Sequence, residues 1–87
     1  SPYIMHTNLR DQLIDLRQKI LISRGMIEIY EDTILYLQNQ IKAHHKMKTI
    51  HYASYLIDQY EHNRKVLKRE KKYLQDLITL KIKIETT

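Results

Sequence analysis

The chain has 87 residues, 29% of them charged, and a formal net charge of +5. The absence of cysteine excludes a disulfide framework, a thiolate zinc site and a cysteine nucleophile. One glycine and one proline are too few for a sheet protein with many hairpins, and a hydrophobic fraction of 43% is too high for a disordered chain. No run of about 18 apolar residues is present, so the sequence predicts no transmembrane helix.

Residues 1–7 contain Pro2 and show no hydrophobic pattern, so they are predicted to be an unstructured lead. Residues 8–87 are predicted to form a single helical domain that begins with a helix from about 8 to 46, with Thr7 or Asn8 as its N-cap. In this segment apolar residues recur at alternating spacings of four and three, which is the heptad seam of a coiled coil. The seam residues are Leu9, Leu13, Leu16, Ile20, Ile27, Ile34, Leu37 and Ile41, with Ser23 and Tyr30 in the remaining positions.

Gly25 is the one candidate break in this first helix, because a glycine inside a helix costs about 1 kcal/mol relative to alanine. The heptad phase is the same before and after Gly25, which favours one continuous helix. The alternative is a three-helix bundle in which the chain turns near residues 23–25.

A turn is predicted at about residues 47–49, followed by a second helix from about 50 to 84 with Thr49 as its N-cap. Its seam consists of Ala53, Leu56, Tyr60, Asn63, Leu67, Glu70, Leu74, Leu77, Lys81 and Ile84. Folding the two seams together in antiparallel register places Ile41 opposite Leu56 and Ile20 opposite Leu77. It also places Glu31 beside Arg64. The predicted fold is therefore all-α, a long antiparallel helical hairpin of the coiled-coil type.

The first helix carries more apolar surface than one seam needs. A second stripe is predicted to be an interface for self-association or for a helical protein partner, and it consists of Ile14, Leu21, Ile22, Gly25, Ile29, Leu35 and Tyr36. A helix that is apolar on two faces is normally buried on both, so two hairpins are expected to pack into a four-helix bundle. Gly25 would then permit close approach between helices.

Most of the positive charge lies in one stretch of the second helix. The residues predicted to contact an acidic partner or phosphate are Arg64, Lys65, Lys68, Arg69 and Lys72, four of which share one helix face at i, i+3, i+4 and i+7 spacing. We call these five residues the basic ridge. The alternative interpretation is a solvated face that keeps the bundle in solution.

No motif predicts catalysis, a cofactor or a metal. His44, His45 and His51 near the turn match no zinc-ligand spacing, and the acidic residues Glu28, Glu31 and Asp32 suit exposed salt bridges. The sequence therefore predicts a protein that is not an enzyme, but a structural oligomerisation or protein–protein docking module of a larger intracellular assembly, cytoplasmic or nuclear. The alternative function is a nucleic-acid-associated helical protein that contacts phosphates through residues 64–72.

Overall fold

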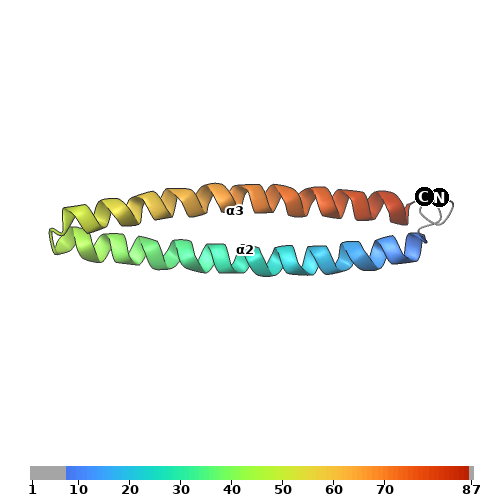
Figure 1. Cartoon of the computed structure of the whole chain (residues 1–87), viewed down its shortest axis with the longest axis horizontal. Helices are drawn as coiled ribbons and strands as arrows, with labels where there is room; N and C mark the ends of the chain where they lie inside the picture. The colour runs from blue at the N-terminus through green and yellow to red at the C-terminus, as the bar shows by residue number, and fades with distance from the viewer. Residues whose placement is uncertain (1–7, 87) are drawn as a thin grey trace, which may run out of the picture.

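The computed structural model describes residues 8–86, which fold into two helices, α2 (Leu9–Lys46) and α3 (Ile50–Glu85). The helices run antiparallel along their whole length and are joined by a tight turn at one end, so that the hairpin is a flat rod (Figure 1). Its Cα atoms extend over 64 × 24 × 14 Å. The all-α helical hairpin predicted from the sequence is confirmed. The lead predicted at residues 1–7 lies outside the described residues.

Gly25 lies inside α2, which is continuous, so the alternative three-helix bundle is wrong. One glycine inside a helix costs about 1 kcal/mol. This cost is small compared with the free energy gained by burying the seam residues on both sides of Gly25. Ile20 and Ile27 flank Gly25 and are both buried in the same seam. A break in the helix at Gly25 would take at least one of these two side chains out of its packing contact with α3.

Local hydrogen bonds fix where α2 begins and ends. The Asn8 side-chain oxygen accepts a hydrogen bond from the backbone N–H of Arg10 at 2.9 Å, which confirms Asn8 as the N-cap. At the other end, the N–H groups of Lys48 and Thr49 donate to the carbonyls of His45 and His44 at 3.2 and 3.1 Å. These are the two hydrogen bonds of a Schellman motif. Lys48 is the residue of this motif whose backbone has the left-handed conformation, with φ = 58°.

Thr49 precedes α3 as predicted, but the prediction that its side chain caps this helix is wrong. Its hydroxyl instead donates to the carbonyl oxygen of His44 at 3.1 Å and lies 2.8 Å from His44 Nδ1. The Schellman turn brings the C-terminal carbonyls of α2 within reach of this hydroxyl. Thr49 therefore ties the turn back to α2.

The core is the narrow seam between the two helices. Its buried hydrophobic residues all occupy predicted seam positions, and they are Leu16, Ile20, Ile27, Leu37, Ala53, Leu56 and Leu77. Ile20 and Leu77, predicted opposite each other, belong to one packed cluster with Leu16. Leu9 is the exception among the seam residues of α2, since it lies beyond the last turn of α3 at the open end and is 54% exposed.

Ser23 is the polar residue in this seam with the least access to solvent. Its exposed fraction is 1%, and its hydroxyl oxygen has no hydrogen-bond partner among residues 8–86. A buried hydroxyl without a partner costs about 1–3 kcal/mol in desolvation. Ser23 is therefore a weak point in the middle of an otherwise apolar row.

We expect Ser23→Ala to raise the free energy of unfolding by about 1–2 kcal/mol, because it removes this hydroxyl and improves helix propensity. The matched control is Ser54→Ala, at an exposed position of α3, where only the propensity gain of about 0.5 kcal/mol applies. Urea unfolding at one chain concentration measures both. Equal increases in the free energy of unfolding from the two substitutions would show that the Ser23 hydroxyl has a hydrogen-bond partner in solution.

Candidate functional site

The hairpin leaves more large hydrophobic side chains on its surface than it buries. Among the described residues, fourteen are exposed, against seven hydrophobic residues in the core. The exposed set is Leu9, Ile14, Leu21, Ile22, Ile29, Leu35, Tyr36, Met47, Tyr52, Tyr55, Ile57, Tyr73, Leu80 and Ile82. They are spread along both helices. An isolated hairpin therefore presents extended apolar surface, which marks interaction sites in soluble proteins.

The six large side chains of the predicted second stripe divide between the two broad faces of the rod. With the seam residues at heptad positions a and d, Ile14, Leu21 and Leu35 fall at position b, and Ile22, Ile29 and Tyr36 fall at position c. Positions b and c lean to opposite sides of the seam. The stripe predicted as one interface is thus two rows, one turned toward each face.

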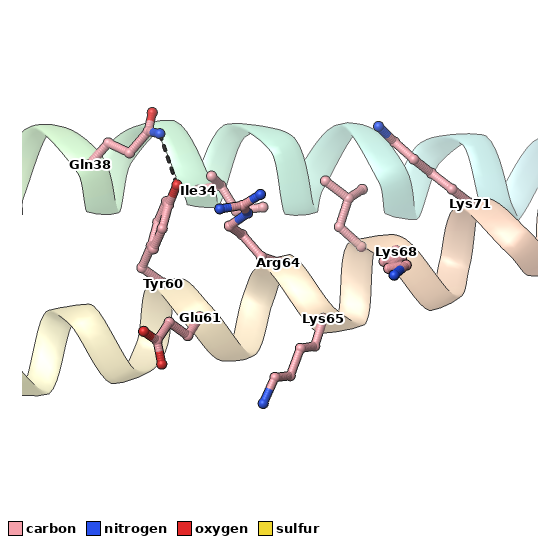
Figure 2. A pocket seen from close by; sticks show the side chains of 9 residues that line it. Ile34, Gln38, Tyr60, Glu61, Arg64, Lys65, Lys68 and Lys71 are labelled. Carbon is pink, nitrogen blue, oxygen red and sulfur yellow. Dashed lines mark hydrogen bonds between the residues drawn. The ribbon is translucent and has the colours of Figure 1, made fainter.

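An open groove of about 760 Å³ lies over the seam on one of these faces (Figure 2). Its apolar floor includes Ile34 from α2 and Leu67 from α3. At one end the Gln38 side-chain amide donates to the Tyr60 hydroxyl at 3.2 Å, which links the two helices. The cations that line the groove are Arg64, Lys65, Lys68 and Lys71, and the one acid among its described lining residues is Glu61.

A second, smaller groove of about 400 Å³ lies nearer the open end, between Ile20 and Leu21 of α2 and Ile78 and Ile82 of α3. Both grooves are lined by residues at heptad position e: Gln38, Arg64 and Lys71 in the first, and Arg17, Arg24 and Ile78 in the second. In an antiparallel pair the e positions of both helices flank the seam on the same side. The two grooves therefore open on one broad face, which we call the groove face.

The structure divides the basic ridge between the first groove and the outer side of α3. Arg64, Lys65 and Lys68 line the first groove together with Lys71, which the predicted set omitted. Arg64 and Lys71 reach toward α2, whereas the Lys65 side chain points away from it (Figure 2). Arg69 and Lys72 do not line the groove. The Lys72 ammonium lies 3.5 Å from the Asp76 carboxylate, and both residues are exposed. The heptad position of Lys71, seven residues after Arg64, was the signal that it belongs here.

The acidic residues of α2 lie beside this groove. Glu31, at position e, and Glu28, at position b, are exposed on the groove face at the level of Arg64 to Lys71. Glu31 was predicted to lie beside Arg64, but these two residues form no ion pair. The Arg64 guanidinium instead lies over the Tyr60 ring, 5.6 Å from its centre.

The opposite broad face is more apolar. We call it the tyrosine face, and its main residues are Ile22, Ile29, Tyr36, Val66, Tyr73 and Leu80. An exposed ion pair lies on this side, with Lys19 Nζ 2.9 Å from an Asp15 carboxylate oxygen. The hydrogen bond to Asp15, and then its charge, raise the pKa of Lys19 above its ordinary value.

The turn end gathers aromatic rings. His44 meets Tyr52 edge-on at 4.5 Å between ring centres, and Tyr52 stacks on Tyr55 at 6.2 Å. Within the part of the chain that the structure describes, no three histidine or acidic side chains are placed to hold a metal ion. Neither helix, over residues 8–86, has a stretch that is long and apolar enough to cross a membrane.

Gly25 was predicted to belong to the interface, and it falls at position f, on the outer edge of α2 between the two rows. A Cβ atom added to Gly25 would meet no heavy atom within 4 Å. We expect Gly25→Ala to raise the free energy of unfolding by about 1 kcal/mol, from helix propensity alone, without changing the mass of the particle in solution. Thermal unfolding and light scattering check this. A loss of mass would mean that another chain approaches the backbone at Gly25.

No protein-family model, curated protein or solved structure matches this chain. The evidence for its function therefore comes from these two faces.

Proposed function

We propose that the protein is a structural oligomerisation or protein-docking module that works through the two broad faces of its hairpin. The observation that carries this proposal is the excess of exposed over buried large hydrophobic side chains. Transfer of one such side chain out of water stabilises a complex by about 1.5–3 kcal/mol. The exposed rows therefore favour packing against further helices, as in a four-helix bundle.

The shape of the site supports binding of an extended partner. Both grooves are open to solvent and lie along a rod 64 Å long. A broad face of 64 × 24 Å exceeds the roughly 800 Å² that each partner buries in a standard protein–protein interface. A helical partner of similar length fits this surface better than a small molecule does.

The test of self-association is the dependence of thermal unfolding on chain concentration. If folding is coupled to association, the unfolding temperature rises as the chain concentration is raised from about 1 to about 100 µM, because association draws on the folded form only. We expect a clear rise over this range. An unfolding temperature that stays constant would contradict self-association.

A second candidate function, association with nucleic acid, is favoured by one observation: four cations and one acid line the first groove. Arg69 and Lys72 continue this charge around α3 and are exposed. A nucleic acid bound there should dissociate as salt is raised, with a slope of about 0.9 in log K per phosphate contact.

The experiment is binding of labelled single- and double-stranded oligonucleotides to the unmodified chain and to a Lys65→Glu, Lys68→Glu, Lys72→Glu variant. The candidate function predicts salt-sensitive binding that the triple substitution abolishes. Absence of binding at low salt, or binding that survives the substitution, would reject it.

A further inference from the structure

We propose that a second copy of this chain covers the groove face, related by a two-fold axis that runs along the rod, with both turns at the same end of the dimer. This inference rests on the proposed self-association and adds to it the face, the orientation and the register. The distribution of charge along the groove face is the observation that supports it.

Opposite charges occupy the same level of the rod on the two helices. The core cluster pairs Ile20 with Leu77, and the first groove joins Ile34 to Leu67. Glu28 and Glu31 lie between Ile20 and Ile34 on α2, and Lys68 and Lys71 lie between Leu67 and Leu77 on α3. The acidic residues of α2 and the cations of α3 are therefore side by side near the middle of one face.

Two arrangements stack a pair of groove faces about a two-fold axis. An axis along the rod places α2 of each copy on α3 of the other, with both turns at one end. An axis across the rod places α2 on α2 and α3 on α3, with the turns at opposite ends. The two arrangements bring different charges together.

The crosswise axis brings like charges together. Glu28 lies at the middle of α2 and Lys68 at the middle of α3. With that axis, Glu28 meets the partner's Glu28 and Lys68 meets the partner's Lys68. Like charges placed opposite one another at an interface oppose binding and exclude the wrong orientation.

The axis along the rod brings opposite charges together, and does so twice because the interface is symmetric. Each copy places Glu28 and Glu31 over the partner's Lys68 and the partner's Arg64. Two like-charge approaches act against this arrangement, one between Arg24 and the partner's Lys71 and one between Arg17 and the partner's Lys81. Lys81 is paired with Glu85 of its own chain at 2.8 Å, which offsets the second of them.

The apolar residues of the groove face follow the same register. Leu21 meets the partner's Ile78, and Ile14 meets the partner's Ile82, so the second groove of each copy is filled. Leu21 and Ile82 are exposed in the single hairpin and lose that exposure in the dimer. In this arrangement apolar contacts supply affinity and the charges select orientation.

The tyrosine face and the outer side of α3 remain open in this dimer. Arg69 and Lys72 stay exposed there, because they fall at heptad positions c and f and line neither groove. They provide a matched control, since a charge change at these residues leaves the proposed interface untouched.

A charge-swap experiment tests the register. Variant one carries Glu28→Lys and Glu31→Lys, and variant two carries Arg64→Glu and Lys68→Glu. Each alone should dimerise about 10- to 100-fold more weakly than the unmodified chain, because both symmetric contacts become repulsive. Mixing the two should restore dimers, since every substituted contact then joins opposite charges. A defect in folding would not be cured by mixing. The control Arg69→Glu, Lys72→Glu has the same charge change as variant two and should dimerise like the unmodified chain.

A distance between the two turns tests the orientation. The chain has no cysteine, so Lys46→Cys provides one exposed labelling site near the turn. Spin labels there should be less than about 30 Å apart, since packed helices lie about 8–10 Å from one another. A distance near the 64 Å length of the rod would overturn the proposed orientation.

The outcomes separate this inference from the proposed function. A chain that remains monomeric at all concentrations contradicts both this inference and the self-association on which it rests, and leaves docking of a different protein as the proposed function. A dimer that is indifferent to the charge swaps, or whose turns lie far apart, leaves self-association standing and overturns the groove-face arrangement alone.

Discussion

Replacement of Leu56 by alanine should lower the free energy of unfolding by about 3 kcal/mol, the largest effect we expect from a single truncation in this chain. Leu56 is 4% exposed and is the most buried of the core hydrophobic residues. Leucine-to-alanine substitutions in cores cost about 2.7–5.0 kcal/mol, the sum of lost transfer free energy and the cavity left behind. The lower part of that range applies here, because a core one seam wide can close partly around the gap.

The control for this prediction is Leu80→Ala, which makes the same chemical change on the tyrosine face, where Leu80 is exposed. We expect it to cost less than about 1 kcal/mol, since little apolar area leaves water when the single hairpin folds. Urea unfolding of both variants at the same chain concentration measures the difference. Similar losses from the two would show that the seam is not the principal core.

The double substitution Leu21→Lys, Ile82→Lys should weaken self-association at least about 100-fold, because it places two ammonium groups of each chain beside Arg17 and Arg24 in the filled second groove. Leu21 is 72% exposed in the single hairpin, so the variant should still fold as helix. Sedimentation equilibrium gives the dissociation constant, and circular dichroism verifies the helix content.

The matched control places the same charges at the same level of the opposite face, as Ile22→Lys, Leu80→Lys. Ile22 is 66% exposed and adjoins Leu21 in sequence, so the two variants differ mainly in which face they change. The control should associate like the unmodified chain. If it dissociates while the Leu21 variant does not, the tyrosine face is the self-association surface.

The seam was predictable because its period of about 3.5 residues is set by helix geometry and does not depend on a partner's details. Every seam position from Leu13 to Ile84 is buried or half-buried, including polar ones such as Asn63 and Lys81. The continuity of α2 through Gly25 followed from the same pattern, since the heptad phase is unbroken there.

The end of the hairpin was less predictable. Thr49 is a good N-cap by residue type, but which acceptor its hydroxyl meets depends on the path of the turn. The left-handed backbone of Lys48 brings the His44 carbonyl within reach, and no local preference of lysine predicts that backbone.

The candidate surfaces were predicted in part. Charge and apolar rows were recognised on each helix separately, which grouped Lys68 with Arg69 and Lys72 and left out Lys71. The first groove combines residues of both helices, and Gln38 belongs to it only because α2 is folded against α3. Heptad positions, by contrast, depend on sequence spacing alone, and they separate Leu21 at position b from Ile22 at position c.

The most direct test of the central claim, that the hairpin associates with a second copy of itself, is the absolute mass of the chain in solution by light scattering after size exclusion, at low and high salt. We expect a particle of twice the chain mass of 10.6 kDa at both, with weaker association at high salt because the charge contacts are screened. A stable particle of one chain mass at high micromolar concentration would contradict the claim.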